Sequence, residues 1–390
     1  MTHIEGTRTR RRQTGPGVSR RPVTPFAREP IWLNNRTAPP APFRRTASRD
    51  VTPDLILPYD GILPVFASRP VWCGRASTVI GAATLGAQAW LGDDSVIRSD
   101  GQPITAGDRF WLGARSTVHI ATESLPTHIG DRVTVGRNAV VHACTVGSDV
   151  VIEDDAIILD GAIVGNNVLI EAGATIFPRS KLESGFAYGG NPAKRLRPVT
   201  PEELAERAER LREASGEAAS PAAPLEPPET EESVFLARTA RLSGRIALGA
   251  GSTVLFSCEL AAEVGPIVVG ADTNIQDNTV IRSRGEGVVI GRDTTIGHNV
   301  RMADCRIGAR SLIGIGSVLA PGTVVADDVM LAGGATTDPG QLLEGGHLWG
   351  GRPARILGTL DSAKRAMMSH IVEGYCRHGR EYRLLQEQEG

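Results

Sequence analysis

The sequence predicts an all-β protein built from two β-solenoids in tandem, each followed by an α-helix. Aliphatic residues recur with a step of six from Ile129 to Val141 and again from Val146 to Leu182, a period that neither an α-helix nor a flat strand produces. Short strands wound into a prism do produce it, because every sixth side chain then points inward. Glycine often follows the aliphatic residue, as in Val164-Gly165, where a small residue is expected to relieve a corner. The ladder positions of this stretch are Ile129, Val135, Val141, Val146, Ile152, Ile158, Val164, Ile170, Ile176 and Leu182.

Composition suits this fold and narrows the choice of partners. Aromatic residues are only 4% of the 390 residues, as expected for a narrow prism filled by Ile, Leu and Val. The formal net charge of −2 predicts no general affinity for nucleic acid or for membranes. There is no apolar run of membrane-spanning length, no signal-peptide core and no CxxC pair among the five cysteines. We therefore expect a reduced, cytoplasmic protein in which Cys144 and Cys305 pack inside the coils.

The same plan occurs twice along the chain. The opening ladder that begins at Val79 recurs from Leu242, 163 residues later, and the ladder that begins at Ile129 recurs from Ile290, 161 residues later. This spacing indicates an internal duplication. The expected segments are a disordered Arg- and Pro-rich tail (1–52), a first β-helix domain (53–200), a helix with an acidic linker (201–232), a second β-helix domain (233–358) and a C-terminal helix (359–390).

Two helix signals follow the solenoids. Thr200, Pro201 and Glu203 form the start of a capping box, which predicts that a charged helix begins there. The segment from Ser362 to Gln388 has a helical pattern and is expected to pack along the second solenoid.

Both halves resemble γ-class carbonic anhydrases and their hexapeptide-repeat relatives. In the first half the resemblance is carried by VIRSDGQPI, STVHI, VTVGRNAVVHAC and GGNPAKRLRP, and in the second half by TNIQD, VVIGRDTTIGHNV and GGRPARILG. The resemblance implies left-handed parallel β-helices, which in this family usually assemble as trimers. It also implies a metal at each interface between units, held by two histidines of one unit and one histidine of its neighbour.

Such a site implies a definite chemistry and definite partners. Three neutral imidazoles leave a fourth position for water, whose pKa the metal lowers toward neutrality. The expected cofactor is Zn2+, or another divalent metal such as Fe2+ or Co2+. The expected substrate is a small molecule, hydrated as carbon dioxide is or used in a related hydrolysis or cyclisation. A homo-oligomer with trimer-like packing of solenoids is expected.

Neither half has the complete histidine set. In the first half His119 and His142 match the first and last ligands of the family, but Arg137 occupies the middle position. In the second half His298 keeps the middle position, while Arg282 and Ala303 replace the outer two. A guanidinium has no lone pair to offer a cation.

The losses in the two halves are complementary. The pair of ligands survives in one half and the single ligand in the other. We therefore expect one composite site, with His119, His142 and His298 as ligands, where a first-half solenoid meets a second-half solenoid. The resemblance also implies supporting catalytic residues that are divided between the halves, namely Arg98 and Asp100 in the first and Gln276 and Asp277 in the second.

Two other functions compete with a metalloenzyme. A metal-free scaffold or assembly protein is one, in which Arg137 and Arg282 form salt bridges where ligands once stood. An acyltransferase that uses acyl-CoA is the other, with His119 or His142 as general base. The remaining histidines of the solenoids and the C-terminal helix are expected to be solvated surface residues: His128, His347, His370 and His378.

Overall fold

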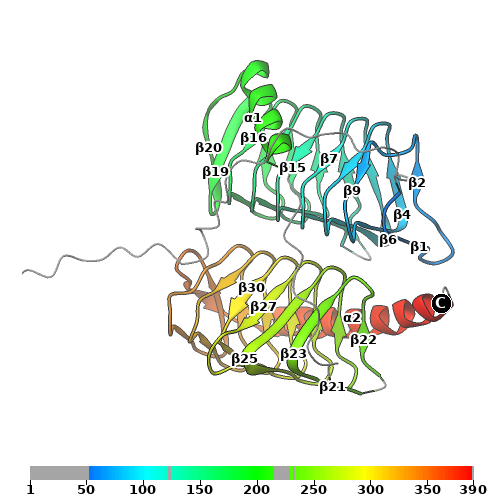
Figure 1. The fold of residues 1–390 in the computed structure, drawn as a ribbon. Helices are drawn as coiled ribbons and strands as arrows, with labels where there is room; N and C mark the ends of the chain where they lie inside the picture. The colour runs from blue at the N-terminus through cyan, green and yellow to red at the C-terminus, as the bar shows by residue number, and fades with distance from the viewer. Residues whose placement is uncertain (1–51, 122–123, 215–228, 232, 389–390) are drawn as a thin grey trace, which may run out of the picture. The chain divides into compact units, whose positions relative to one another are not determined.

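The computed structural model describes residues 52–121, 124–214, 229–231 and 233–388. In these residues it contains two consecutive parallel β-solenoids, each followed by an α-helix, as the sequence predicts (Figure 1). The expected disordered tail and most of the expected acidic linker lie outside the described residues. Neither helix in the described part of the chain is long and apolar enough to cross a membrane.

The first solenoid is made of short strands that pair in parallel from coil to coil and end in an antiparallel pair, β19 with β20. Its strands are β1 (Leu55–Leu57), β2 (Val65–Phe66), β3 (Trp72–Cys73), β4 (Thr78–Leu85), β5 (Trp90–Leu91), β6 (Val96–Ala106), β7 (Trp111–Leu112), β8 (Thr117–His119), β9 (Thr127–Ile129), β10 (Thr134–Val135), β11 (Val140–His142), β12 (Thr145–Val146), β13 (Val151–Ile152), β14 (Ile157–Ile158), β15 (Ile163–Val164), β16 (Leu169–Ile170), β17 (Thr175–Ile176), β18 (Lys181–Leu182), β19 (Phe186–Gly190) and β20 (Ala193–Pro198).

The second solenoid repeats this arrangement, including the antiparallel end formed by β37 and β38. Its strands are β21 (Glu229–Thr230), β22 (Phe235–Leu236), β23 (Arg241–Leu248), β24 (Thr253–Val254), β25 (Glu259–Val269), β26 (Asn274–Ile275), β27 (Val280–Ser283), β28 (Val288–Ile290), β29 (Thr295–Ile296), β30 (Arg301–Ala303), β31 (Arg306–Ile307), β32 (Leu312–Ile313), β33 (Val318–Leu319), β34 (Val324–Val325), β35 (Met330–Leu331), β36 (Leu342–Leu343), β37 (His347–Gly350) and β38 (Arg355–Thr359).

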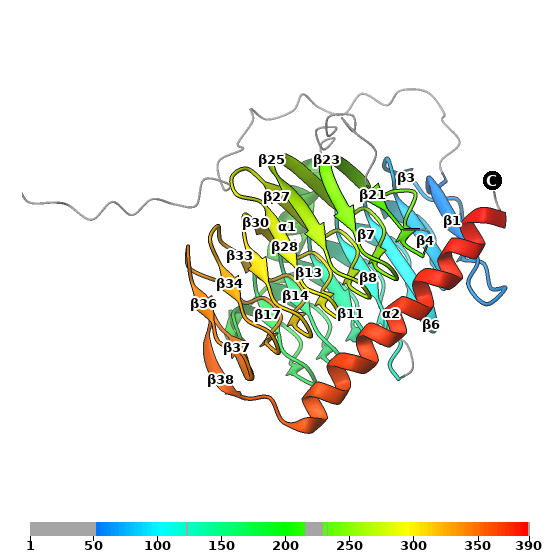
Figure 2. The same ribbon diagram turned by 90° about the horizontal axis from the view of Figure 1, so that it is seen from below.

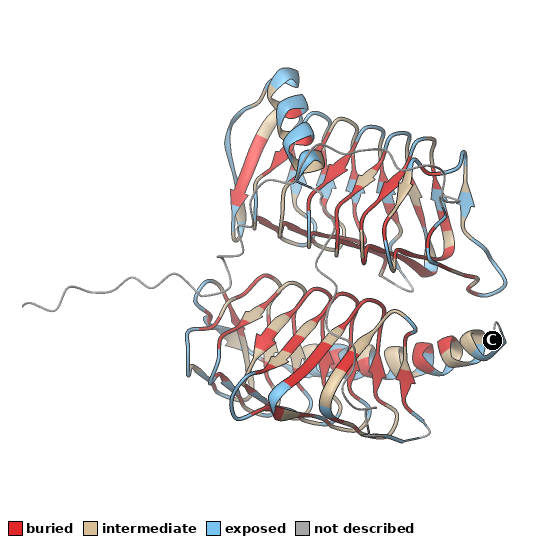
Figure 3. Ribbon diagram, viewed as in Figure 1, coloured by how far each residue is buried: buried red, intermediate tan, exposed pale blue. Residues whose placement is uncertain are grey.

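The ladder residues form the core of each prism. Every ladder position between Ile129 and Leu182 is buried in one hydrophobic cluster, and the second half has its own cluster (Figure 3). Cys144 and Cys305 lie in these clusters, as expected, and all five cysteines are unpaired. The period of six therefore identified the inward side chains correctly.

Glycines after the ladder residues serve close coil stacking rather than a left-handed backbone. A Cβ on Gly136 would lie 2.6 Å from the backbone nitrogen of Asp154, and a Cβ on Gly113 would lie 2.2 Å from the carbonyl oxygen of Gly136. Neither glycine has a positive φ. The positive-φ corners are instead often occupied by Asp, Asn or Arg, such as Asn138 (φ 53°).

The two helices differ in what they contact. Helix α1 (Pro201–Glu213) begins at the predicted cap, where Thr200 Oγ1 accepts a hydrogen bond from the Glu203 nitrogen at 3.3 Å. It packs against β10 and β13 of its own solenoid. Helix α2 (Ser362–Gln388) packs against β22, β24, β26 and β29 of the second solenoid, as expected. It also reaches residues of the first solenoid, which the sequence did not predict (Figure 2).

Matching corners of the two solenoids form hydrogen bonds with each other. Thr117 Oγ1 donates to Asn299 Oδ1 at 2.7 Å and accepts from Asn278 Nδ2 at 3.0 Å. Asn299 Nδ2 also donates to the carbonyl oxygen of Arg115 at 2.8 Å. Arg115 and Asn278 are equivalent in the duplication, so corresponding corners of the two halves face each other within one chain.

Candidate metal centre

Two of the predicted ligands lie side by side at the ends of neighbouring strands. His119 ends β8 and His142 ends β11, and these strands pair in parallel with His119 opposite His142. Both side chains are buried. Their facing nitrogens, His119 Nδ1 and His142 Nε2, are 3.2 Å apart.

The third predicted ligand comes from the other solenoid. His298 occupies the corner between β29 and β30 and is fully buried. Its ring centroid lies 4.8 Å from that of His119 and 5.6 Å from that of His142. Each of the three histidines offers a nitrogen within 4.8 Å of those of the other two. One chain therefore brings the three histidines together, without a second copy.

A carboxylate lies beside the outer nitrogen of each imidazole. His119 Nε2 is 2.9 Å from Asp100 Oδ1, and His142 Nδ1 is 2.7 Å from Asp160 Oδ1. His298 Nδ1 is 3.2 Å from Asp277 Oδ2. Carboxylates placed in this way fix the tautomer and the ring orientation of metal-binding histidines.

These carboxylates are ionised. Burial alone would raise the pKa of Asp277, but Arg98 and His298 outweigh it and lower the pKa to about 2. Burial likewise opposes ionisation of Asp100, whose pKa Arg98 and His119 nevertheless hold well below its usual value. For Asp160, His142 overcomes burial and lowers the pKa. An ionised carboxylate only accepts hydrogen bonds, so His119 Nε2 and His142 Nδ1 carry the protons that they share with Asp100 and Asp160.

The inner nitrogens of two of the histidines face each other. His119 Nε2 and His142 Nδ1 face carboxylates, so the other ring nitrogens, His119 Nδ1 and His142 Nε2, face each other 3.2 Å apart, where lone pairs of neutral imidazoles could bind a metal. Burial and nearby Arg98 hold the pKa of His119 well below its ordinary value, so the His119 ring is neutral. Burial also lowers the pKa of His298, to about 4.

This donor set fits a divalent metal. Two nitrogens that are each about 2.0–2.1 Å from a tetrahedral zinc ion lie roughly 3.3–3.4 Å apart. The separation between His119 and His142 is close to that value. Neutral imidazoles are good ligands for zinc and for other first-row metals.

Arg98 connects the supporting carboxylates of the two halves. Its side chain is fully buried, and its Nε donates to Asp277 Oδ2 at 2.8 Å while its Nη1 donates to Asp100 Oδ2. Its Nη2 lies 3.3 Å from the hydroxyl of Tyr375 on α2. That hydroxyl is also 3.4 Å from His298 Nε2. Burial raises the pKa of Tyr375, so the hydroxyl stays protonated.

The expected role of His378 as a solvated residue is wrong. His378 is 4% exposed, and its Nδ1 lies 2.9 Å from Asp100 Oδ2. The physical reason is that α2 turns one face toward the first solenoid, which buries that face. Of the other histidines expected to be solvated, His128 and His370 are exposed, whereas His347 is only partly so.

The remaining predicted residues lie elsewhere. Gln276 is buried, and its amide nitrogen donates to Asn274 Oδ1 at 3.1 Å. Arg137 pairs with Asp154 at 3.3 Å and Arg282 pairs with Glu263 at 3.1 Å. Both arginines thus form salt bridges at the positions where ligands are missing.

Sequence reasoning missed four residues near the site, namely Asp160, Tyr375, His378 and Tyr382. Only the first carried a usable signal, because Asp160 follows His142 by 18 residues, which is one coil of the solenoid. The other three lie on α2, whose approach to the first solenoid is a tertiary feature.

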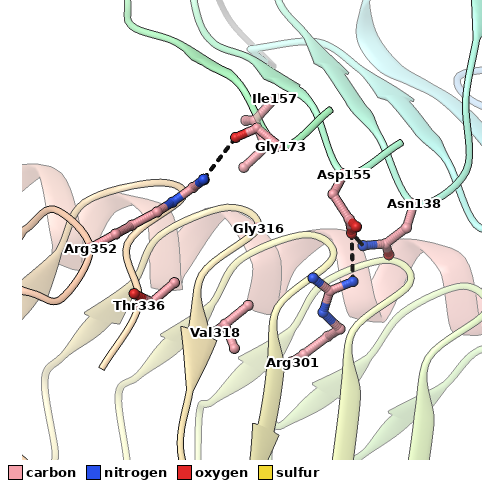
Figure 4. A pocket seen from close by; sticks show the side chains of 9 residues that line it. All are labelled: Asn138, Asp155, Ile157, Gly173, Arg301, Gly316, Val318, Thr336 and Arg352. Atoms are coloured by element: carbon pink, nitrogen blue, oxygen red, sulfur yellow. Dashed lines mark hydrogen bonds and ion pairs between the residues drawn. The ribbon is translucent and has the colours of Figure 1, made fainter. Parts of the chain in front are cut away.

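A small cleft lies on the same contact between solenoids. The volume of the cleft is about 180 Å3. Gly316 in its wall lies one coil after His298, and the Gly316 nitrogen donates to the carbonyl oxygen of His298 at 2.8 Å. Arg301 pairs with Asp155 at 2.6 Å across it (Figure 4). The lining residues are Asn138, Asp155, Ile157, Gly173, Arg301, Gly316, Val318, Thr336 and Arg352.

Comparison with known proteins identifies the family. Residues 143–178 match the model for bacterial transferase hexapeptide (six repeats), and residues 103–143 and 303–338 match the hexapeptide repeat of succinyl-transferase. Protein YrdA of Escherichia coli (strain K12) is 35% identical over 158 residues, which are 39% of this chain and 85% of YrdA. The chain belongs to the hexapeptide-repeat β-helix family related to γ carbonic anhydrases and YrdA.

Other members of this hexapeptide-repeat family match a smaller share of their own length. Gamma carbonic anhydrase 1, mitochondrial, of Arabidopsis thaliana is 33% identical over 154 residues, covering 37% of this chain and 56% of the relative. The chain thus spans about half the length of the γ carbonic anhydrases it matches. A solved hexapeptide transferase family protein from Anaplasma phagocytophilum has 32% identity, with 40% of this chain and 92% of that chain covered, at a TM-score of 0.39. The fold class is confirmed as two tandem left-handed parallel β-helices, each followed by a helix.

Proposed function

We propose that this chain is a divergent metalloenzyme of the carbonic anhydrase type, with one composite three-histidine site between its unlike halves. The observation that carries the proposal is that His119 Nδ1 and His142 Nε2 face each other 3.2 Å apart in a buried position, with His298 beside them. Two lone pairs at that distance are stabilised by a cation between them, and a divalent metal would serve both nitrogens at once. His298 supplies a third imidazole from the other solenoid.

The chain's own residues would hold the ligands in register. Asp100 and Asp160 orient His119 and His142 through hydrogen bonds, Asp277 lies 3.2 Å from His298 Nδ1 without a well-aligned hydrogen bond, and Arg98 contacts both Asp100 and Asp277. When bound, a divalent metal such as zinc would supply Lewis acidity that lowers the pKa of water toward neutrality. The proposed substrate is carbon dioxide or another small electrophile that water attacks.

Tyr375 would orient the reacting groups. Its hydroxyl lies 3.4 Å from His298 Nε2, the nitrogen that faces away from Asp277. Because burial keeps this hydroxyl protonated, it can donate a hydrogen bond to a substrate oxygen at the centre. The hydroxyl also lies next to Arg98, which limits where it can turn.

The proposal is tested by catalysis of carbon dioxide hydration. Metal-loaded wild-type protein should accelerate the reaction in a stopped-flow pH-indicator assay, and His298→Ala should abolish the acceleration. His370→Ala, on the exposed part of α2, is the matched control and should retain it. If fully metal-loaded wild-type protein does not accelerate the reaction, carbon dioxide is excluded as the substrate, and another small electrophile must be hydrated instead.

The two competing functions make different predictions. A metal-free scaffold agrees with the salt bridges of Arg137 and Arg282, and it predicts that purified protein takes up no metal. An acyltransferase predicts consumption of an acyl thioester. None of the nine residues lining the cleft is a histidine, so no general base of that kind lies there. We also propose a homo-oligomer with trimer-like packing of solenoids. The histidine site itself does not require one, because its three histidines meet within one chain.

A further inference from the structure

The C-terminal helix lies against both halves of the chain. Helix α2 follows the second solenoid and packs along it (Figure 2). The Tyr59 hydroxyl of the first solenoid nevertheless donates to Glu381 Oε2 on this helix at 2.5 Å. One turn of α2 comes especially close to the second solenoid at Gly379, where a Cβ would lie 2.3 Å from Thr253 Cγ2. This close contact fixes the position of the neighbouring residue, His378.

Asp100 receives two hydrogen bonds from this helix. Its Oδ2 is 2.9 Å from His378 Nδ1 and 2.8 Å from the hydroxyl of Tyr382, and it also accepts from Arg98. Its other oxygen, Oδ1, is the one that accepts from His119 Nε2. Donors on both oxygens prevent the buried carboxylate from rotating, so Oδ1 stays aimed at His119.

The helix donors are themselves held by packing. Tyr382 is fully buried, and its ring lies 5.2 Å from Phe256 and 5.7 Å from both Phe235 and Tyr59, measured between ring centroids. Phe235 and Phe256 belong to the second solenoid, whereas Tyr59 belongs to the first. Aromatic residues of both halves therefore fix the hydroxyl that contacts Asp100.

We propose that His378 and Tyr382 are positioning residues for the ligand His119, acting through Asp100. This inference rests on the proposed metal site. Both residues donate to Asp100 Oδ2, so both act on the rotation of this one carboxylate. Outer groups that orient a histidine ligand typically change metal affinity by about 10–100-fold when removed. We expect the lower end of that range, since Arg98 still holds Asp100 in either variant.

The experiment measures metal affinity directly, without reference to catalysis. Tyr382→Phe removes one hydroxyl and His378→Phe removes one donor while keeping a ring. His378→Asn replaces the imidazole but keeps an N–H donor near the original Nδ1. His370→Phe changes an exposed position of the same helix and serves as the control. The dissociation constant for Co2+ is measured by competition with a chelator, together with the visible spectrum of the bound cobalt and the thermal midpoint of metal-free protein.

Tyr382→Phe and His378→Phe should each weaken cobalt binding about tenfold and alter its spectrum. His378→Asn should regain most of the affinity, and His370→Phe should match wild type. Folded Tyr382→Phe and His378→Phe with wild-type affinity and spectrum would overturn the positioning role, even where the thermal midpoint falls. Absence of cobalt binding by wild type would instead overturn the proposed function, and this inference with it.

Discussion

Arg98 Nε donates to Asp277 Oδ2 at 2.8 Å, and this hydrogen bond joins the two halves of the chain across 179 residues of sequence. Both side chains are fully buried. Because Arg98 also contacts Asp100, one guanidinium bridges a carboxylate from each solenoid. The ion pair thus fixes the two walls of the histidine cluster relative to each other.

Removal of Arg98 should destabilise the protein strongly. Arg98→Met leaves two buried carboxylates without their cation, and breaking a buried pair in this way costs about 3–5 kcal/mol. The free energy of unfolding from urea titration gives the measurement. Arg137→Met, in an exposed pair with Asp154, should change it by less than ~1 kcal/mol. Equal effects of the two substitutions would show that the Arg98 network does not hold the halves together.

The ladder should not tolerate charge. Ile158→Asp places a carboxylate in the dry interior of the first solenoid, at a cost of several kcal/mol, so the domain should unfold or aggregate. Ile163→Asp is a matched control, because Ile163 points outward on the next strand and is 45% exposed. Thermal unfolding monitored by circular dichroism compares the two variants. An unchanged midpoint in Ile158→Asp would show that Ile158 does not belong to the core.

Metal-free protein should lose stability in mild acid. The pKa of His298 falls from about 6.5 in the unfolded chain to about 4 in the folded protein. Between these values the unfolded chain binds more protons, so the free energy of unfolding decreases as the pH drops through this window. A shift of that size corresponds to ~3 kcal/mol.

The pH effect is measured by urea unfolding in the presence of a chelator at pH 7 and at pH 5. His298→Asn should show a smaller loss of stability between the two conditions than wild type. His370→Asn should show the wild-type loss. Identical pH dependence in wild type and His298→Asn would mean that His298 titrates normally in the folded chain.

The repeat and the ligand set could both be predicted from the sequence, for separate reasons. A period of six leaves one inward side chain per strand, so Ile158 and its equivalents were assigned to the core from spacing alone. His119, His142 and His298 came from matching each half to one motif and comparing what each had lost. Their convergence in one chain required the two halves to face each other through matching corners, which spacing does not determine.

The contribution of α2 could not be predicted in the same way. A helical pattern shows which face is apolar, but it does not show that the face is shared between two solenoids. His378 therefore had the features of a solvated histidine, although it donates to a buried aspartate. Glycine was expected to relieve corners, whereas Gly136 is required because the next coil is too close for a Cβ.

Metal stoichiometry is the measurement that tests the composite site most directly. Wild-type protein, saturated with zinc, desalted and analysed by mass spectrometry, should hold one ion per chain. His298→Ala should hold almost none, because two histidines and water seldom retain zinc tightly, while His370→Ala should hold one. No zinc in the reconstituted wild type, or a full complement in folded His298→Ala, would contradict a site shared between the two halves.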